Sequence, residues 1–414
     1  MIFAREVDIA VVGGGAAGVA AARRLAGAPV SVLLLEARDR LGGRAHTVQA
    51  GDFSVDLGCG WLHSADINEW LPIAEGLGYT IDRTPPPWMR QAFNLHYPPE
   101  DQAAYRQAFN ALEERVEAAA ADNLPDRPVS DLLEPGSRWN ARLNAFSGAY
   151  NGAPFDDISV HDYHAYQDTG TNWRIAEGYG TTVATYGAEL PVAMGAPVTR
   201  IEHDGARLRL ITPDGILEAR AAIVAVPTAV IAEGRLGFDP PLPDKTAAAA
   251  NLPLGHVNKA FLALDDPEAL PAETTLTTRF DTPKTGTYHL RPFHRPMIEG
   301  FFGGDLAGEL ERAGEAAFGA FAIEELVGLL GSDFRHKVRL LTASTWAMEP
   351  WTGGAYSHAR PGHADARAIL REPVENRLFF AGEACSPHYF STAHGAFETG
   401  VAAADAALKA LGIG

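Results

Sequence analysis

Residues 7–36 read VDIAVVGGGAAGVAAARRLAGAPVSVLLLE, and this stretch decides the fold. Its first part, Val7–Val12, is a short β-rich run with few polar side chains, which is typical of a parallel strand buried on both faces. An alanine-rich helix is expected from Ala17 to about Ala26, and a second buried strand over Val30–Leu35. A strand, a helix and a strand in this order predict a β-α-β unit.

Three glycines at the G-x-G-x-x-G spacing join the first strand to the helix. Gly13 permits a tight turn, Gly15 lets a pyrophosphate approach the backbone, and Gly18 lets the helix pack closely against the strand. The N–H groups at the start of the helix favour phosphate. Glu36, at the end of the second strand, is placed to accept hydrogen bonds from ribose hydroxyls. The sequence therefore predicts a dinucleotide site; the alternative is a glycine-rich turn that binds no ligand.

The segment after Glu36 favours FAD as that dinucleotide. Residues 36–44 read EARDRLGGR, in which Gly42 and Gly43 permit a second close approach of the backbone and Arg44 can pair with a phosphate. No second G-x-G-x-x-G follows another strand, whereas a flavin–nicotinamide reductase usually needs two such sites. One FAD molecule held along its length is the simpler interpretation.

The composition is that of a globular protein. The 414 residues suffice for two or three domains of roughly 150 residues each. Hydrophobic residues make up 46% and charged residues 21%, which excludes a disordered, collagen-like or disulfide-scaffold chain. The formal charge of −18 (34 Lys and Arg against 52 Asp and Glu) repels phosphate backbones, so we expect no nucleic-acid partner. It suits a cationic substrate, although solubility alone also explains it.

Location and metal content are predicted from sparse features. Two cysteines, Cys59 and Cys385, provide no disulfide framework and fit a reducing cytoplasm, where we expect the protein to be; both are interpreted as small buried thiols. The longest weakly polar stretch, residues 11–22, is too short for a bilayer, so no membrane partner is expected. No histidine pair has a zinc-binding spacing, and no metal site is expected. The sequence leaves the oligomeric state open.

Six blocks of sequence resemble the flavin-containing amine oxidases, a family that includes monoamine oxidases, polyamine oxidases and lysine-specific histone demethylases. The first and last blocks are highly specific together, and the others follow in the family's order. The blocks are VVGGGAAG with LEARDRLGGR in residues 11–44, DLGCGWLH in residues 56–63, the segment around residues 178–180 with Val198 and the strand ending at residue 227, FDPPLPDK and GHVNK in residues 238–259, Trp346 with GGAYS in residues 353–357, and FFAGEACSPHYFSTAHGAFETG in residues 379–400.

The resemblance implies an α/β chain, α+β overall. A Rossmann-like FAD-binding domain would be assembled from discontinuous segments, and a mixed sheet-and-helix domain would bind the substrate. The expected FAD-binding segments are 1–82, 176–236 and 338–414, and the substrate-binding segments are 83–175 and 237–337. The local pattern adds helices over 101–123, 315–330 and 394–411, a strand over 257–264, and turns at Asp204-Gly205 and Asp214-Gly215 between alternating strands.

Lys259 ends the GHVNK block. The family places a lysine here, linked through water to the flavin N5, where the substrate hydride arrives, so the resemblance implies a catalytic role for Lys259. A partly buried ammonium can relay a proton, or stabilise negative charge that develops on oxygen. The alternative is a strand lysine whose long side chain reaches solvent.

His63 follows Trp61 in the DLGCGWLH block. Animal and yeast polyamine oxidases have a similar Trp-x-His near the substrate amine, whereas monoamine oxidases differ here. The resemblance therefore favours polyamine substrates, with His63 binding or deprotonating the ammonium group, because its ordinary pKa is close to physiological pH. The alternative is a structural histidine bonded to a loop carbonyl.

Tyr356 and Thr392 are considered together. Monoamine oxidases frame the flavin with two tyrosines that form an aromatic cage for the amine. Tyr356 matches the first of these and Thr392 stands in place of the second, so the implied cage is half complete, with one aromatic face left to attract a cation. The alternative for Tyr356 is ordinary packing. Ala355 stands where monoamine oxidases attach FAD through a cysteine, which implies that the FAD is not covalently bound.

The resemblance also implies a set of residues that contact the cofactor. They are Gly13, Gly15, Gly18, Glu36, Arg38, Gly43, Arg44, Gly60, Trp61, Val198, Trp346, Gly382, Glu383 and Ala393. The other tryptophans are expected to be packing residues: Trp70, Trp88, Trp139, Trp173 and Trp351.

The expected function is FAD-dependent oxidation of an amine. A hydride would pass from the α-carbon of the neutral amine to the flavin, the imine would hydrolyse, and dioxygen would reoxidise the flavin to give hydrogen peroxide. Two alternatives stay open. The first is a flavin-dependent desaturase, similar to carotenoid desaturases or protoporphyrinogen oxidase. Such enzymes lack the match at Lys259 and Tyr356, and a hydrophobic, membrane-docking substrate domain would favour this alternative, whereas the helix expected over 101–123 is polar. The second alternative is a protein that binds FAD without catalysing a reaction.

Overall fold

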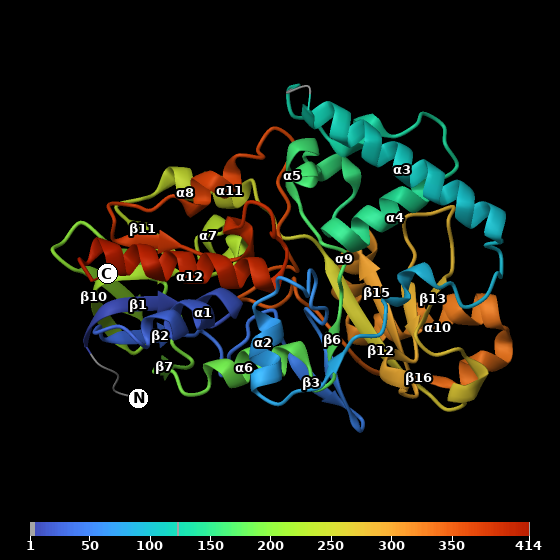
Figure 1. The fold of residues 1–414 in the computed structure, drawn as a ribbon, viewed down its shortest axis with the longest axis horizontal. Coiled ribbons are helices and arrows are strands. Elements are labelled where there is room, and N and C mark those ends of the chain that lie inside the picture. Colours follow the sequence, from blue (N-terminus) through green and yellow to red (C-terminus); the bar gives the residue numbers. More distant parts are fainter. Residues whose placement is uncertain (1–4, 122–123, 414) are drawn as a thin grey trace.

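The computed structural model describes residues 5–121 and 124–413, which form two halves (Figure 1). Residues of both halves line a cavity. The first half is built on β1 (Glu6–Val12), which pairs in parallel with β2 (Val32–Leu35) on one side and β10 (Gly215–Val224) on the other. The sheet has eight strands. The remaining strands are β7 (Val192–Ala193), β8 (Arg200–Glu202), β9 (Leu208–Thr212), β11 (Gly237–Asp239) and β17 (Leu378–Phe380).

Helices cover both faces of this sheet, as expected for buried parallel strands. On one face α1 (Ala16–Leu25) lies along α12 (Ala393–Ala410), and their backbones touch, because a Cβ on Gly400 would lie 2.1 Å from the carbonyl oxygen of Ala17. The same face holds α2 (Trp70–Gly76) and α6 (Tyr179–Gly187). The other face is covered by α7 (Thr228–Ala232), α8 (Pro243–Ala250) and α11 (Ala366–Arg371).

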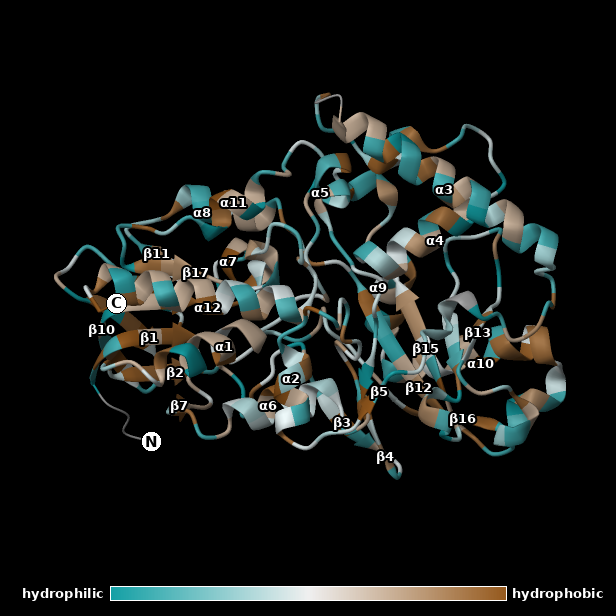
Figure 2. Ribbon diagram, in the orientation of Figure 1, coloured by the Kyte–Doolittle hydropathy of each residue, from teal (hydrophilic) through white to brown (hydrophobic). Residues whose placement is uncertain are grey.

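The second half contains a five-stranded antiparallel sheet. Its strands, in spatial order, are β13 (Thr274–Thr277), β14 (Thr287–Leu290), β15 (Met297–Gly303), β12 (Val257–Leu264) and β16 (Val338–Ala343). One face packs on α9 (Gly304–Ala313) and α10 (Glu315–Leu330), whose ribbons carry many apolar residues (Figure 2), in an apolar core. The other face lines the cavity. Side chains alternate between these two faces along each strand.

A third group of helices lies above the cavity and has its own core. It consists of α3 (Pro99–Ala121), α4 (Asn140–Asn151) and α5 (Val160–Ala165). Leu112 and Val116 of α3 are buried in this core. Two short ladders complete the described strands: β3 (Thr47–Ala50) with β4 (Phe53–Asp56), and β5 (Ile81–Asp82) with β6 (Arg174–Ile175).

The predicted elements agree closely with those observed. The strand over 257–264 and the helix over 315–330 have the expected ends, and the last helix differs by one residue at each end. The helix expected over 101–123 begins at Pro99, and its residues 122–123 lie outside the described residues. The second strand begins at Val32 instead of Val30, because the chain still turns between α1 and β2.

Strand pairing differs from the expected segmentation at two places. Residues 338–343 form β16, which pairs with β12 in the second sheet, although the boundary at 338 assigned them to the FAD-binding half. Residues 237–239 form β11, which pairs with β8 in the first sheet, although they were assigned to the substrate-binding half. Long-range pairing decides which sheet a strand joins, and the local pattern carries no information about it. The division into two domains stays a prediction.

Among the described residues, no helix combines the length and apolar character needed to cross a membrane.

Candidate active site

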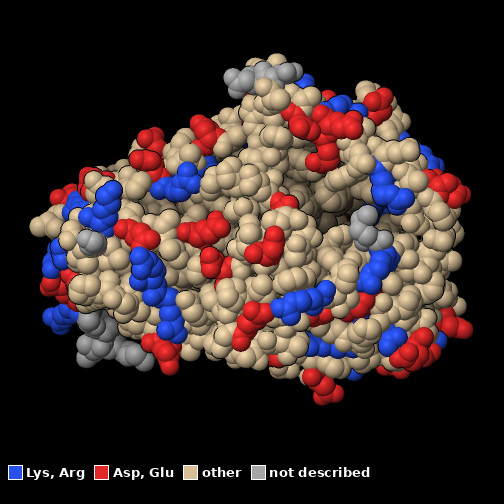
Figure 3. Space-filling model, in the orientation of Figure 1, with Lys and Arg blue, Asp and Glu red and all other residues tan. Residues whose placement is uncertain are grey.

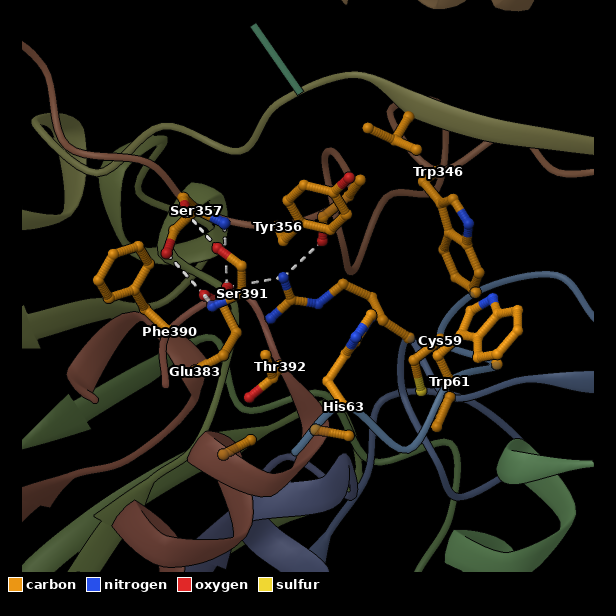
Figure 4. A pocket seen from close by; sticks show the side chains of 18 of the residues that line it. Cys59, Trp61, His63, Trp346, Tyr356, Ser357, Glu383, Phe390, Ser391 and Thr392 are labelled. Carbon is orange, nitrogen blue, oxygen red and sulfur yellow. Dashed lines mark hydrogen bonds and ion pairs between the residues drawn. The ribbon is translucent and has the colours of Figure 1, made fainter. Parts of the chain in front are cut away.

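A cavity of about 950 Å³ lies between the two halves. Its lining comes from the turns that follow β1, β2 and β10, the start of α12, the inner face of the second sheet, and the helices α3 and α4. Figure 3 shows a hollow on the right of the molecule, below the place where α3 and α4 lie in Figure 1, and Figure 4 shows side chains that line the cavity. Every predicted site residue lines this cavity except Gly18.

The glycine turn after β1 has the geometry that a dinucleotide site needs. Gly13 has φ of +103°, and a Cβ there would lie 2.6 Å from the carbonyl oxygen of Ala225. A Cβ on Gly18 would lie 1.8 Å from the carbonyl oxygen of Gly13, so the helix packs against this turn as predicted. A Cβ on Gly15 would meet only Gly43, at 4.0 Å, so the backbone of Gly15 borders open space at the start of α1.

Glu36 follows β2 and lies across this turn. Its side chain is buried, with Oε2 accepting from the N–H of Gly14 at 2.6 Å and Oε1 accepting from the N–H of Arg38 at 2.8 Å. These bonds fix the carboxylate at the wall of the cavity. The side chain of Arg38 pairs with Glu349 at 2.9 Å and donates to Thr352. Arg38 is thus oriented by protein groups.

Arg44 and Glu383 form an ion pair in the middle of the cavity wall, with Nη1 and Oε1 separated by 2.8 Å (Figure 4). Arg44 also donates to the carbonyl of Ala355, and Glu383 accepts from Ser357 and from the N–H of Ser391. Burial raises the pKa of Glu383, but Arg44 and Arg367 outweigh this effect and hold the pKa below its ordinary range. Arg44 was expected to pair with a phosphate; in the structure its guanidinium also has an internal partner, Glu383.

Thr392 caps the last helix. Its Oγ1 accepts from the N–H of Gly395 at 3.0 Å and donates to the carbonyl of Tyr389 at 2.6 Å. The cap aims the start of α12 at the cavity, where Ala393 also lies. The hydroxyl is therefore engaged in holding the helix end, so what Thr392 contributes to the cavity is mainly its small size in place of a second tyrosine.

Lys259 lies on β12 and does not reach bulk solvent. Its side chain is 8% exposed, and Nζ lies 2.9 Å from Oε1 of Glu299 and 3.2 Å from the carbonyl oxygen of Asp56. Burial raises the pKa of Glu299, but Lys259 and His289 outweigh burial and lower that pKa. Glu299 is therefore a carboxylate at neutral pH. The alternative of a solvent-reaching lysine is excluded by this geometry.

Sequence reasoning missed the partners of Lys259. His289 on β14 lies 3.8 Å from Glu299 and 3.0 Å from Glu273, and Glu273 pairs with Arg174 at 2.8 Å. His289 and Glu299 line the cavity on the same face of the sheet as Lys259. A sequence signal existed, because each is a charged or polar residue between apolar neighbours in a short β-rich run.

His63 has the geometry of a hydrogen-bond acceptor toward the cavity. Its Nδ1 lies 2.6 Å from Oδ1 of Asn172, and because an amide oxygen only accepts, Nδ1 carries the proton and Nε2 keeps a lone pair. Burial lowers the pKa of His63, so the ring is neutral at physiological pH. The observed partner is a side-chain amide and not the loop carbonyl of the structural alternative.

Aromatic side chains form much of the remaining wall. Trp61 and Trp88 meet edge to face, with ring centroids 4.8 Å apart, and Trp346 donates from Nε1 to the carbonyl of Leu57 at 3.1 Å. The expectation that Trp88 and Trp351 are packing residues was wrong, because both line the cavity and Trp88 is 46% exposed. Both belong to connecting segments, whose position the local sequence does not determine.

Tyr356 is also one of the predicted site residues. Tyr356 lines the cavity, and its hydroxyl donates to the carbonyl of Ala149 at the end of α4. This bond fixes the ring at the junction of the two halves.

Burial raises the pKa of both thiols, Cys59 and Cys385, to about 12, which makes them poor nucleophiles at neutral pH.

The family model for flavin containing amine oxidoreductases matches residues 16–120 and 104–408. The chain belongs to this family. Polyamine oxidase 4 of Oryza sativa subsp. japonica is 29% identical over 97% of this chain and 88% of that protein. Lysine-specific histone demethylase 1B of Mus musculus is 26% identical over 95% of this chain but only 52% of that protein.

Solved structures share the fold at lower identity. Wild-type putrescine oxidase bound to putrescine has a TM-score of 0.75 at 19% identity, covering 97% of this chain and 98% of that chain. Cyclohexylamine oxidase from Brevibacterium oxydans IH-35A has a TM-score of 0.75 at 20% identity, covering 98% and 99%. The expected fold class and family resemblance are confirmed. The protein is a flavin-dependent oxidoreductase that acts on amines.

FAD, the expected cofactor, fits the residues of the cavity. The open backbone at Gly15, the start of α1 and the buried carboxylate of Glu36 form one end of a continuous lining, and Gly382, Ala393 and Trp346 lie along its length. These groups offer N–H donors to phosphates and a fixed acceptor to a ribose. Within the described part of the chain, no group of three or more His, Cys, Asp or Glu side chains is placed to hold a metal ion.

Proposed function

We propose that this protein oxidises a primary or secondary amine to an imine and passes the electrons to dioxygen. One observation carries the proposal. The neutral His63 and the Lys259–Glu299 ion pair line the same cavity as the dinucleotide-binding turn. A proton acceptor for the amine, a fixed cation and a flavin site thus line one cavity.

His63 is the residue proposed to make the amine reactive. An amine reaches the enzyme mainly as an ammonium ion, and its α-hydrogen leaves as hydride only after the nitrogen has lost a proton. The lone pair on Nε2 of His63 accepts a hydrogen bond from the ammonium and then the proton. Tyr356 presents an aromatic ring to the same cavity, which attracts the cationic form as it binds.

Lys259 is proposed to act as a fixed positive charge that holds a water molecule. Its ion pair with Glu299 and its bond to the carbonyl of Asp56 leave little freedom to the ammonium group. A charge held in this way stabilises negative charge that develops nearby without first having to move. The side chain of Lys259 is buried and that of Glu299 is only 15% exposed, so little bulk water reaches this part of the wall.

The bound FAD supplies the hydride acceptor and, through its reaction with dioxygen, the route to hydrogen peroxide. Loss of a proton and a hydride converts the amine to an imine, which water hydrolyses to a carbonyl compound and a smaller amine or ammonia. FAD is held without a covalent bond in this proposal, because Ala355 has no thiol to attach it. The arrangement favours amines over the carbocycles of desaturases, since His63 and Lys259 would have no task with such substrates.

The experiment that tests the proposal is anaerobic mixing of the purified flavoprotein with a panel of amines. Putrescine, spermidine, benzylamine and hexylamine sample diamines, polyamines, aromatic and alkyl monoamines. We expect at least one of them to bleach the flavin absorbance, and admission of air to restore the colour with one peroxide per turnover. If none of them bleaches the flavin, the proposed activity is wrong. Bleaching without peroxide formation would replace dioxygen by another electron acceptor.

A further inference from the structure

Arg142, on α4, is a cavity-lining cation without an acidic partner. Its Nε is shielded from solvent and makes no hydrogen bond, and its Nη2 reaches only Thr277, at 3.4 Å. Among the residues that the structure describes, no carboxylate lies within ion-pair distance of Arg142. Arg142 is half-buried, and its shielded Nε has neither water nor a hydrogen-bond acceptor, which carries a desolvation cost that a bound anion would offset.

The other buried charges of the cavity contrast with Arg142. Arg38 pairs with Glu349, Arg44 with Glu383 and Lys259 with Glu299. Asp162 is likewise paired, with Arg367 at 2.6 Å. The protein therefore supplies counter-ions to the charges near the flavin site and supplies none, within the described chain, to Arg142.

The arm of the cavity that contains Arg142 is aromatic and positively charged. The guanidinium carbon of Arg142 lies 5.6 Å from the ring centroid of Tyr105, and Arg106 lines the same arm from an exposed position. The residues that α3 and α4 contribute to the lining include no aspartate or glutamate: they are Tyr105, Arg106, Phe109, Asn110, Arg142, Ala145, Phe146, Ala149, Tyr150 and Asn151. Blue atoms of Lys and Arg also border the hollow on its right-hand side in Figure 3. Among the described lining residues, α3 and α4 therefore provide no carboxylate that could neutralise the second ammonium group of a polyamine.

We propose that the substrate amine carries an anionic group, a carboxylate, at its far end, and that Arg142 binds it. This inference rests on the proposed function, because it takes the reacting amine to lie near His63 and Tyr356. The planar guanidinium can bond a carboxylate through two parallel N–H donors, and the partly buried position strengthens that pairing. The same charge repels a distal ammonium group, so polyamines are disfavoured.

Helix α4 gives the length of such a substrate. The hydroxyl of Tyr356 donates to the carbonyl of Ala149, which is seven residues after Arg142 on the same helix. Seven residues at 1.5 Å each correspond to about 10 Å between the two positions. An amine separated from its carboxylate by several methylene groups spans this interval, and the aromatic rings of Tyr105, Phe109 and Phe146 provide an apolar lining for the methylene groups.

The first test compares substrates that differ only at the far end. For the wild-type flavoprotein, kcat/KM for 6-aminohexanoate should be at least about tenfold higher than kcat/KM for hexylamine. The difference from 1,6-diaminohexane should be larger still. A series of substrates from 4-aminobutanoate to 8-aminooctanoate should show an optimum length. Arg142→Gln should reduce the ratio of 6-aminohexanoate to hexylamine to near one, mainly through KM, and Arg142→Lys should keep part of it. Arg138→Gln, at an exposed arginine that pairs with Asp101, is the matched control and should leave the ratio unchanged.

A second test does not require turnover. Hexanoate should perturb the flavin spectrum of the wild-type protein at concentrations where the neutral isostere hexanamide does not, and Arg142→Gln should abolish the difference. If hexanoate and hexanamide bind equally, or if the diamine is the best substrate and Arg142→Gln leaves the ratios unchanged, the inference is wrong. If no amine reduces the flavin but hexanoate still binds through Arg142, the proposed function fails and the anion site stands.

Discussion

The Nζ atom of Lys259 lies 2.9 Å from Oε1 of Glu299, and the two side chains are diagonal neighbours on adjacent strands. In the register of β12 and β15, Lys259 is opposite Phe301 and Glu299 is opposite Phe261, so both charges project from the same face toward the cavity. Neither charge has a favourable place in that wall without the other. The pairing of the two strands therefore holds the ammonium group of Lys259 in one fixed position at the cavity wall.

The role of this pair can be separated from its contribution to stability with two variants. Lys259→Met leaves Glu299 with only the weaker contact to His289, at 3.8 Å, and loss of one member of a buried pair costs up to about 3–5 kcal/mol, so the melting temperature of the flavoprotein should fall. Adding Glu299→Gln removes the poorly compensated charge and should recover most of the stability. Turnover should stay low in both variants, because the fixed cation is absent from both. Stopped-flow measurement of flavin reduction and of flavin reoxidation identifies the affected step; wild-type rates in the double variant would make Lys259 a structural residue.

The outer part of the same network predicts a pH dependence of stability. Burial raises the pKa of Glu273, but its bonds to His289 and Arg174 outweigh burial and lower the pKa to about 2. A carboxyl whose pKa is lower in the folded than in the unfolded state stabilises the fold at neutral pH, and this stabilisation is lost as the pH falls from the unfolded value of about 4.3 toward 2. Glu273→Gln should therefore be destabilising at pH 7 and roughly half as destabilising at pH 3, where the folded carboxyl is still mostly ionised. Denaturant unfolding of the wild type and of Glu273→Gln at the two pH values measures the difference in their free energies of unfolding. If that difference is the same at both pH values, the lowered pKa of Glu273 is contradicted.

Asn172 controls the protonation of His63 in our interpretation. Replacing the neutral acceptor by a carboxylate, Asn172→Asp, places a negative charge beside Nδ1 and favours the imidazolium, which raises the pKa of His63 by roughly 1–3 units. The acid limb of kcat/KM should move to higher pH by a similar amount. Asn172→Leu, which removes the acceptor without adding charge, serves as the comparison and should lower activity without that upward shift. An unchanged pH profile in Asn172→Asp would show that His63 does not take the proton.

Local patterns in the sequence predicted much of this molecule. The unit β1-α1-β2 and the helix α10 depend on contacts between residues close in the chain, and their positions were predicted within two residues. Seventeen of the eighteen predicted site residues line one cavity, and the other, Gly18, packs behind it. The resemblance to a known family carried most of that result, because the glycine turn alone located only one end of the site.

Long-range pairing explains what the sequence did not predict. Glu299 and His289 approach Lys259 only because three strands from separate parts of the chain align in one register. Arg142 was missed because a helix shows its apolar period but not the neighbours of its polar side chains. The pairing of β16 with β12 was not predicted, because the residue pattern of a strand does not identify the strand beside it. Each of these features needs the assembled fold.

The attachment of FAD can be tested directly. Ala355 cannot form a thioether, and desolvation raises the pKa of both thiols to about 12, although only Cys385 is buried as expected and Cys59 is partly exposed, so we expect no covalent link. Acid precipitation of the purified protein should leave all of the flavin in the supernatant, and a denaturing gel should show no fluorescent band. Flavin that precipitates with the polypeptide would contradict the prediction and would direct attention to the cysteine nearest the site, Cys59.

Glu36 tests the other end of the cofactor site. Its carboxylate already bonds the N–H groups of Gly14 and Arg38 and is proposed to accept from the ribose of FAD as well. Glu36→Ala removes the acceptor from all of these donors. A hydrogen bond to a charged group contributes about 1.5–3 kcal/mol, so the dissociation constant for FAD should rise roughly ten- to a hundredfold. Glu36→Gln keeps the shape and an acceptor oxygen and should lie between the wild type and the alanine variant.

The measurement is titration of the apoprotein with FAD, followed by quenching of flavin fluorescence. Glu114→Ala, at an exposed position on α3 far along the chain from the glycine turn, controls for the loss of one negative charge and should bind FAD as the wild type does. A loss of affinity confined to Glu36→Ala, with an unchanged circular dichroism spectrum, assigns the effect to the ribose contact. Equal affinity in the wild type and in Glu36→Ala would mean that the adenosine lies elsewhere, and the orientation of FAD inferred from the glycine turn would have to be reversed.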